Sequence, residues 1–350
     1  MSANPLPEAE LGRYLEAQVP GFRGPLSAEK FKGGQSNPTY LIEAASGRYV
    51  LRRKPPGQLL ASAHAVDREF RVLEALHGGT VPVAEPIHLC RDDGVIGSMF
   101  YLMGYVDGRI HWDPALPELA PAQRSACYEE IVRVLASIHA VDPAAVGLAD
   151  YGKPGNYFAR QLARWREQYR QSVTVDEIPA MDALGAWLEQ RCPPDDGQVS
   201  LVHGDFRIDN LIFAADGPRV LAVVDWELST LGHPLADLAY FCMALRLPRN
   251  PVIPGLAGQD RAQLGIPAEE DLLAWYRART GRDPGSSWPF YLAFNFYRLA
   301  AIAQGVAKRA LQGNASNEQA ANVGRMTAVV AGLGLAVAQE TDATTREVPA

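Results

Sequence analysis

The segment Val202-His-Gly-Asp-Phe-Arg-Ile-Asp-Asn-Leu-Ile-Phe213 decides the fold, together with Leu221-Ala-Val-Val-Asp-Trp-Glu227 shortly after it. Each segment contains a short β-prone run, and the dipeptide Asp216-Gly217 between them favours a tight hairpin turn. In an antiparallel hairpin, the start of the first strand lies beside the end of the second. The pattern therefore predicts that the side chains of Asn210 and Asp225 converge on one point.

An amide oxygen from Asn210 and a carboxylate from Asp225 form a ligand set that suits magnesium. This hard cation usually takes few ligands from the protein and completes its octahedral shell with water and substrate phosphates. We therefore expect Asn210 and Asp225 to hold Mg²⁺.

Asp205 precedes Asn210 by five positions. That spacing matches the catalytic loop of kinases, in which the aspartate accepts the proton of the substrate hydroxyl and the asparagine binds metal. Arg207 follows where a cation can stabilise the charge that spreads over a transferring phosphoryl group. A single Asp or Asn in a loop is usually a turn or cap residue. The ordered set instead favours catalytic roles for Asp205 and Arg207.

The overall composition is that of a folded globular protein. The 350 residues are 47% hydrophobic and 21% charged, which argues against a disordered or fibrous chain. The 33 Lys and Arg against 40 Asp and Glu give a formal charge of -7, and we find no long basic run. This balance disfavours nucleic acid and anionic membranes as partners.

Cysteine usage and the chain ends favour a cytoplasmic location. The four cysteines lie far apart, without the close pairs typical of zinc sites. Residues 1–20 lack the basic start and the continuous apolar stretch of a signal peptide. The most apolar stretch, 326–338, is shorter than the ~20 residues that a membrane-spanning helix needs.

The order of predicted elements divides the chain into two lobes. Residues 1–105 combine a short opening helix with β-prone runs at 31–43, 48–54, 85–90 and 99–105 and a helix over 62–77. The rest is mostly helical, with long helices expected at 122–140, 157–171, 180–191, 269–280, 289–311 and 317–339. The sequence predicts an α+β fold: a small β lobe with one helix, a connector near 103–108 and a large mainly helical lobe.

Several motifs resemble those of a known enzyme family. Three of them are similar to signatures of the aminoglycoside-phosphotransferase superfamily of kinases: His203-Gly-Asp-Phe-Arg-Ile-Asp-Asn210, Asp225-Trp-Glu227 and Leu235-Ala-Asp-Leu-Ala239. A narrower resemblance is to the branch that includes the kinase-like domain of large acyl-CoA dehydrogenases. It rests on Tyr49-Val-Leu-Arg52, Pro55-Pro-Gly57, Ser62–Phe70, Gly232-His-Pro234 and Gln304-Gly-Val306.

The resemblance runs from about Phe31 to Ser316. It implies a bilobal protein-kinase-like fold with a small antiparallel β lobe, an N-terminal nucleotide-binding lobe at 1–105, a C-terminal catalytic and substrate-binding lobe at 106–350, and ATP with Mg²⁺ as cofactors. In the resembling family Asp237 braces the catalytic loop. It follows Asp225 by only twelve residues, which leaves no room for the long activation segment of a protein kinase and disfavours a peptide substrate.

The strand over 48–54 and the helix after it predict further nucleotide contacts. Alternate strand residues share a face, so Val50, Arg52 and Lys54 point together. Arg52 falls where a protein kinase has its phosphate-binding lysine, with Val50 placed to pack on adenine and Lys54 as an alternative phosphate contact. Glu69 lies at an inward edge of the helix and can pair with Arg52, although a solvated Glu69 is the alternative.

The remaining nucleotide contacts are expected from loops. Gly34 and Ser36 lie in a Gly-rich turn whose backbone N–H groups can cover phosphates. Met103 and Tyr105, in the connector between the lobes, should offer backbone hydrogen bonds to adenine. Gly104 stands where we expect an acidic residue in close relatives, which leaves these connector contacts open.

Tyr291, Asn295 and Arg298 lie on one face of a predicted helix, at intervals of four and three. This stripe could line a pocket for the phosphoryl acceptor. The alternative is that its polar groups make hydrogen bonds within the protein.

The motifs favour an enzyme that moves the γ-phosphoryl group of ATP to a hydroxyl of a small molecule. The branch resemblance suggests a hydroxyacyl or hydroxy-acid acceptor. One alternative is an antibiotic kinase for aminoglycosides or macrolides, and an acidic acceptor pocket would favour the cationic aminoglycosides. Another is a non-catalytic nucleotide-binding module, which the unusual Arg52 and Gly104 leave open. The sequence determines neither the oligomeric state nor the preference for ATP over GTP.

Overall fold

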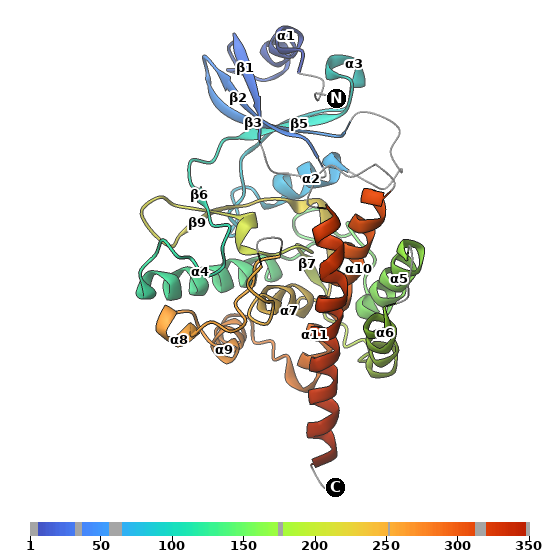
Figure 1. The fold of residues 1–350 in the computed structure, drawn as a ribbon. Helices are drawn as coiled ribbons and strands as arrows, with labels where there is room; N and C mark the ends of the chain where they lie inside the picture. Colours follow the sequence, from blue (N-terminus) through green and yellow to red (C-terminus); the bar gives the residue numbers. More distant parts are fainter. Residues whose placement is uncertain are drawn as a thin grey trace.

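The structure of the protein, a computed structural model, describes residues 6–31, 37–55, 65–173, 178–250, 253–311 and 320–347. A small N-terminal lobe, at the top of Figure 1, is stacked on a larger helical lobe, as the sequence predicted. Within the described ranges, no helix is both long and apolar enough to cross a membrane.

The N-terminal lobe is built on a five-stranded antiparallel sheet with the order β1-β2-β3-β5-β4. Its strands are β1 (Leu26–Lys30), β2 (Thr39–Ala44), β3 (Gly47–Arg53), β4 (Pro86–Cys90) and β5 (Phe100–Gly104). The predicted antiparallel sheet is confirmed. Its first strand, β1, lies before the predicted run at 31–43. The sequence did not predict β1, because this strand is mostly exposed and polar and has no alternating apolar pattern.

Three helices accompany this sheet: α1 (Glu8–Gln18), α2 (Val66–Leu76) and the single turn α3 (Asp93–Ile96). The helix predicted over 62–77 is α2, and residues 62–64 lie outside the described residues. The two faces of the sheet differ in what covers them. Leu51 of β3 is fully buried on the face covered by α1, in a core with Leu15. Its neighbours Val50 and Arg52 point to the opposite face, where Arg52 pairs with Glu69 of α2.

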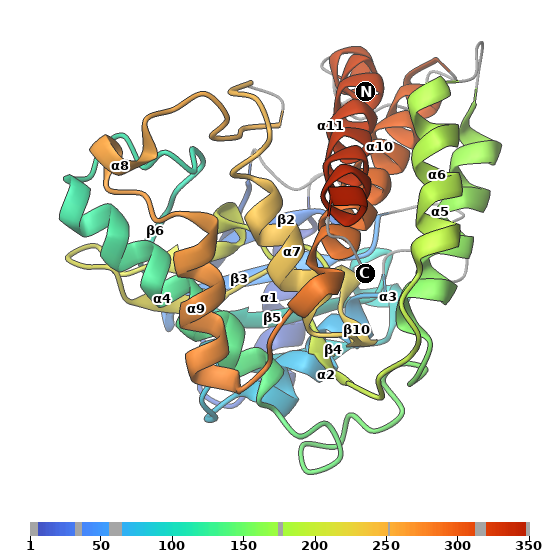
Figure 2. The ribbon, with the colours of Figure 1, turned by 90° about the horizontal axis from the view of Figure 1, so that it is seen from below.

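The C-terminal lobe holds the larger hydrophobic core. Helices α10 (Trp288–Leu311) and α11 (Ala320–Glu347) run side by side, and α5 (Tyr157–Ser172) and α6 (Pro179–Arg191) pack against them, as Figure 2 shows. On the other side, α4 (Pro121–His139) packs against α9 (Glu269–Thr280) and the short α8 (Arg261–Leu264). These six long helices are the six that the sequence predicts. Every residue of α7 (Leu235–Met243) is buried, and this helix escaped prediction because it has no polar face to mark its period.

Short strands carry the segment that decides the fold. The strands β6 (Arg109–Ile110), β8 (Leu211–Phe213) and β9 (Val220–Val223) form one sheet in that order, and β7 (Ser200–Val202) pairs with β10 (Thr230–Gly232). The described residues of the lobe also form the 3₁₀ turns η1 (Ile208–Asn210), η2 (Trp226–Leu228) and η3 (Gly285–Ser287). A Cβ on Gly108 would lie 2.4 Å from the carbonyl oxygen of Phe213, so only glycine lets the connector pass this close to β8. We propose that the lobes meet in this connector, with the boundary between residues 105 and 106.

Helix α2 fixes the small lobe to the large one. Its Arg68 donates a hydrogen bond to the carbonyl of Tyr151 at 2.7 Å and places its guanidinium carbon 4.0 Å from the centre of that ring. The amide of Val223 in β9 donates to the carbonyl of Pro82 at 2.8 Å, in the chain between α2 and β4. These contacts hold Glu69 of α2 at the junction of the lobes.

The two faces of β3 predict different effects of truncation. Leu51→Ala should lower the free energy of unfolding by about 2–5 kcal/mol, because it opens a cavity in a closed core. Val50→Ala should cost less, because this residue faces the junction between the lobes instead of the α1 core. Urea unfolding followed by circular dichroism measures both, and equal losses would contradict this assignment of faces.

Candidate active site

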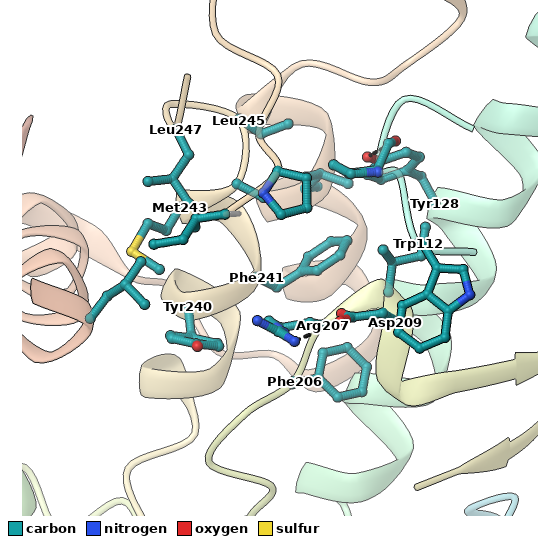
Figure 3. A pocket seen from close by; sticks show the side chains of 17 residues that line it. Trp112, Tyr128, Phe206, Arg207, Asp209, Tyr240, Phe241, Met243, Leu245 and Leu247 are labelled. Atoms are coloured by element: carbon teal, nitrogen blue, oxygen red, sulfur yellow. Dashed lines mark hydrogen bonds and ion pairs between the residues drawn. The ribbon is translucent and has the colours of Figure 1, made fainter. Parts of the chain in front are cut away.

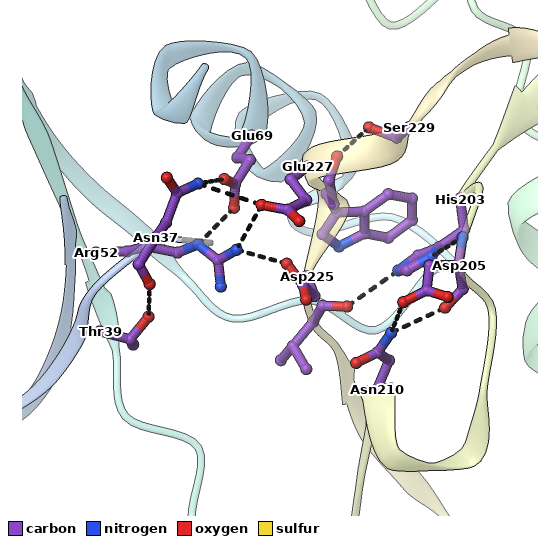
Figure 4. Close-up of polar contacts among 12 residues, drawn as sticks. Asn37, Thr39, Arg52, Glu69, His203, Asp205, Asn210, Asp225, Glu227 and Ser229 are labelled. Carbon is purple, nitrogen blue, oxygen red and sulfur yellow. Dashed lines mark hydrogen bonds and ion pairs between the residues drawn. The ribbon is translucent and has the colours of Figure 1, made fainter. Parts of the chain in front are cut away.

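The hairpin of β8 and β9 brings two predicted site residues together. In its antiparallel register Leu211 lies opposite Val223, and the amide of Val224 donates to the carbonyl of Asn210 at 3.0 Å. Asn210, just before β8, and Asp225, just after β9, therefore lie at the same end of the hairpin (Figure 4). The hairpin thus brings the two residues to one place, and the convergence of their side chains on a metal ion stays a prediction.

Asp225 has a left-handed backbone, with φ 67° and ψ 57°. Residues other than glycine rarely adopt this conformation, although aspartate and asparagine tolerate it better than most. Its carboxylate turns toward Arg52, whose Nη2 lies 2.5 Å from Oδ1, and the side chain stays 32% exposed. Backbone strain at a partly open carboxylate is typical of a residue held for function.

Arg52 is the centre of an ion-pair cluster that joins the two lobes (Figure 4). Its Nε lies 2.9 Å from Oε2 of Glu69 in α2. Its Nη2 lies 2.5 Å from the carboxylate of Asp225 and 3.4 Å from that of Glu227, both in the large lobe. The predicted pairing of Arg52 with Glu69 is confirmed. The alternative of a solvated Glu69 is wrong, because this side chain is only 2% exposed.

The cluster around Arg52 is short of positive charge. Three carboxylates face one guanidinium, so two negative charges are in excess when all are ionised. Burial raises the pKa of Glu69 to about 7, since desolvation and the charges of Asp225 and Glu227 outweigh the attraction of Arg52. The local electrostatics therefore favour an additional cation at this point.

Asp205 and Asn210 contact each other in the loop before β8. The Nδ2 of Asn210 donates to the main-chain carbonyl of Asp205 at 2.8 Å and to its Oδ2 at 3.2 Å, which leaves the amide oxygen as a possible metal ligand. Burial would raise the pKa of Asp205, but the charge of Arg207, a hydrogen bond with Tyr240 and the charge of Arg298 together lower it. Asp205 is therefore ionised at neutral pH.

Asp237, on α7, braces this loop. Its Oδ2 accepts a hydrogen bond from the amide of His203 at 2.6 Å, and its Oδ1 accepts one from the amide of Gly204 at 2.9 Å. His139 lies 3.4 Å from the same carboxylate. Burial acts to raise the pKa of Asp237, yet these partners lower it. The structural role that the sequence predicts for Asp237 is confirmed.

The stripe on α10 makes hydrogen bonds within the lobe. Arg298 donates to the carbonyl of Gly204 and lies over the ring of Tyr240, with 5.1 Å from its guanidinium carbon to the ring centre. Asn295 is fully buried and donates to two main-chain carbonyls, one on α7 and that of Tyr291, at 3.0 Å each. The hydrogen-bonding alternative is therefore confirmed for Asn295 and Arg298.

A family model described as the phosphotransferase enzyme family matches residues 27–278 of the chain. The chain belongs to this family. A crystal structure from Ralstonia eutropha, provisionally named an aminoglycoside phosphotransferase, is 48% identical, with a TM-score of 0.86 over 96% of this chain and 99% of that one. The fold also matches aminoglycoside phosphotransferase APH(4)-Ia, solved with ADP and hygromycin B, at a TM-score of 0.62 and 14% identity, over 94% of this chain and 97% of that one.

The narrower resemblance is also confirmed. Acyl-CoA dehydrogenase family member 10 from Mus musculus is 47% identical over 330 residues, which cover 94% of this chain and 31% of that protein. The chain spans less than half the length of the curated relatives that it matches.

Beside the loop that carries Asp205, the protein has a cavity of about 250 Å³ (Figure 3). Arg207 lines it, with a side chain that is 43% exposed. Its Nη2 lies 2.6 Å from Oδ2 of Asp209, and its Nε lies 3.8 Å from Oδ1 of Asp205. The structure thus brings Arg207 next to Asp205, and its contact with a transferring phosphoryl group stays a prediction. The three residues Tyr291, Asn295 and Arg298 are not among the described residues that line this cavity.

The other predicted nucleotide contacts lie where the small lobe meets the connector. Val50 and Met103 are partners across β3 and β5. The ring of Tyr105 lies 4.2 Å from the guanidinium carbon of Arg48, and its amide donates to the carbonyl of Arg48 at 3.4 Å. Their contacts with adenine stay predictions, and Gly34 and Ser36 lie outside the described residues.

Sequence reasoning missed two partners of Glu69. Asn37 is fully buried and donates from Nδ2 to Oε1 at 2.7 Å, and the hydroxyl of Tyr101 donates to Oε2 at 3.2 Å. A signal existed for both. Asn37 ends the Gly-rich turn, and Tyr101 pairs with Arg52 in the sheet and so shares its face.

Removing the negative charge of Asp237 should weaken the hydrogen bonds that hold the loop at His203 and Gly204. Asp237→Asn leaves one carbonyl oxygen where two carboxylate oxygens now accept hydrogen bonds, so we expect a loss of roughly 2–4 kcal/mol in unfolding free energy. Chemical denaturation measures this loss. Asp142→Asn is the matched control, because exposed Asp142 also accepts from a backbone amide, that of Ala144. A loss no larger than that of the control would show that Asp237 does not brace the loop.

Proposed function

We propose that this protein transfers the γ-phosphoryl group of ATP to a hydroxyl of a small molecule that carries an apolar acyl chain. One observation carries this proposal: Asp205 contacts Asn210, Asn210 lies beside Asp225, and Asp225 pairs with Arg52. These contacts join the proposed base, the two proposed oxygen ligands and the proposed phosphate-binding cation, which are the groups that phosphoryl transfer uses.

Asp205 is the proposed general base. Its lowered pKa keeps the carboxylate ready to accept the proton of the acceptor hydroxyl. Arg207, close to the same carboxylate, is the proposed stabiliser of charge on the transferring group. Positioning and charge stabilisation account for most of the catalysis in this kind of reaction.

Magnesium and ATP fit the groups around Arg52. Asn210 and Asp225 would hold the cation, which suits a cluster with an excess of negative charge, and the bound metal would neutralise charge on the phosphates. Arg52 would bind phosphate oxygens through its fork of donors. Val50, Met103 and Tyr105 would contact adenine, and the turn with Gly34 and Ser36 would cover the phosphates. Within the described residues no cluster of three His, Cys, Asp or Glu suits a metal, and magnesium does not need one.

The cavity beside Arg207 supports a hydroxyacyl or hydroxy-acid acceptor. Of its described lining residues only Asp209 is acidic, and that carboxylate is already paired with Arg207. A polycationic aminoglycoside would find little there to neutralise its charge. The mainly apolar lining instead suits a hydrocarbon chain.

Two alternatives predict other results. An antibiotic kinase would consume ATP with an aminoglycoside or a macrolide, and a non-catalytic module would bind ATP without consuming it. A screen of ATP consumption against hydroxy acids, hydroxyacyl thioesters, aminoglycosides and macrolides separates these cases. ATP consumption with the first two classes alone supports the proposal.

The proposed base and metal ligand should fail in different ways. Asp205→Asn should leave the affinity for Mg-ATP nearly unchanged while turnover falls by about 10²–10⁴-fold, because only help with proton transfer is lost. Asp225→Asn should weaken magnesium-dependent ATP binding as well as turnover. Asparagine also tolerates the left-handed backbone of Asp225, so the hairpin should persist.

Calorimetric titration of both variants with ATP, with and without magnesium, makes the comparison. The magnesium-free titration is the control, because loss of a metal ligand should matter little there. Equal Mg-ATP affinities in the two variants would overturn the division of roles between Asp205 and Asp225.

The phosphate contact can be assigned by comparing two neighbouring cations. Arg52→Ala should weaken ATP binding, and Arg52→Lys should restore only part of it, because lysine offers a single point of charge. Lys54→Ala is the comparison variant, at the first residue after β3. If Lys54→Ala weakened ATP binding and Arg52→Ala did not, the phosphate contact would be assigned to Lys54 instead.

A further inference from the structure

The cavity beside Arg207 has both exposed and buried residues in its wall. Trp112 is 66% exposed and Arg207 is 43% exposed, and both line it. Other lining residues are closed off from solvent: Leu272 is fully buried, Tyr128 is 2% exposed and Met243 is 3% exposed. The cavity thus has a mouth beside Trp112 and Arg207, and part of its wall lies within the core of the helical lobe.

Polar groups gather at the mouth of this cavity. Arg207 and Asp209 pair with each other there, and Figure 3 places Phe241 between them and Leu245. In the buried part of the wall, the hydroxyl of Tyr128 donates to the carbonyl of Pro114 at 2.8 Å, so only its ring is left to face the cavity. A sugar or another polyhydroxyl ligand would lose hydrogen bonds to water there without replacement, whereas a hydrocarbon chain would lose none.

The volume of the cavity limits what it can hold. An apolar cavity of about 150 Å³ in another protein accommodates benzene, which has six carbon atoms. At the same ratio, the 250 Å³ found here would accommodate about ten carbon atoms. An apolar pocket of this size with a few polar groups at its mouth has the usual form of a site for a small ligand.

We infer that this cavity binds the alkyl chain of the acceptor and limits its length to about ten carbon atoms, with Trp112 as the outer wall. The inference deepens the proposed function and rests on it for the link to phosphoryl transfer. Arg207 lines the cavity and lies 3.8 Å from Asp205, so a chain seated here would hold its hydroxyl end near the base. An exposed indole at the mouth would lose contact with water when a chain lies against it.

The binding test needs no phosphoryl transfer. Straight-chain carboxylates without a hydroxyl, from butanoate to dodecanoate, are titrated into the protein by calorimetry in the presence of Mg-ADP. Affinity should rise about four-fold for each added methylene, as expected for burial of apolar surface, and should stop rising near ten carbons. Affinity independent of chain length, or a rise that continues through dodecanoate, would overturn the inference.

Variants in the wall should change the length limit. Ala244 lines the cavity and is half-buried, so Ala244→Phe should fill part of the space, weaken decanoate at least tenfold and leave hexanoate nearly unaffected. Trp112→Ala should weaken chains of every length. Ala183→Phe, on the exposed side of α6, is the matched control and should bind like the unchanged protein. An Ala244→Phe variant that binds decanoate like the control would contradict the inference.

Separate titrations with Mg-ATP distinguish this inference from the proposed function. Intact ATP binding and turnover, without the chain-length limit, would overturn the cavity assignment alone. Chain binding with the expected limit, but without ATP binding, would overturn the proposed kinase activity and leave the cavity assignment standing.

Discussion

The guanidinium of Arg52 is the interaction on which the site depends. Its side chain is only 11% exposed, and a buried charge is tolerated only when it is paired. The carboxylates that pair with it come from both lobes, Glu69 from α2 and Asp225 and Glu227 from the segment after β9. Arg52 therefore holds the two lobes together and positions the carboxylates of the site through the same ion pairs. Burial would lower the pKa of Arg52, but these three acids raise it, so its charge is secure.

The choice of arginine follows from this geometry. A kinase lysine is a compact point charge that pairs with one carboxylate, whereas the planar fork of arginine carries five donors. Here Nε faces Glu69 while Nη2 faces Asp225 and Glu227, so one side chain spans acids that a single ammonium could not reach together. Arginine at position 52, where a protein kinase has lysine, is thus compatible with an intact site.

Much of this arrangement was predictable from the sequence, because its causes are local. The Asp216-Gly217 turn and the two short β-prone runs beside it predict a hairpin. The alternation of side chains in the strand puts Arg52 on its inner face, and the helical spacing after it puts Glu69 on the inner face of the helix, so the two can pair. Other features depend on distant partners. Helix α7 has no polar face to mark it, and β1 is an exposed polar edge. The cavity draws its walls from segments between Trp112 and Leu299, so no local pattern could reveal its volume.

Stability alone does not explain the Arg52 cluster. Replacing buried ion pairs by apolar residues of similar size is often neutral or stabilising. Glu69 has a pKa of about 7 in the folded protein, above its ordinary value of 4.5. A carboxyl whose pKa rises on folding contributes stability below its unfolded pKa, and that contribution is lost as the pH rises through 7. At neutral pH and above, Glu69 thus favours folding less than it does in acid. A strongly shifted group with a defined charge partner is typical of a functional site, and a cluster that is short of positive charge can gain stability when a cation binds to it.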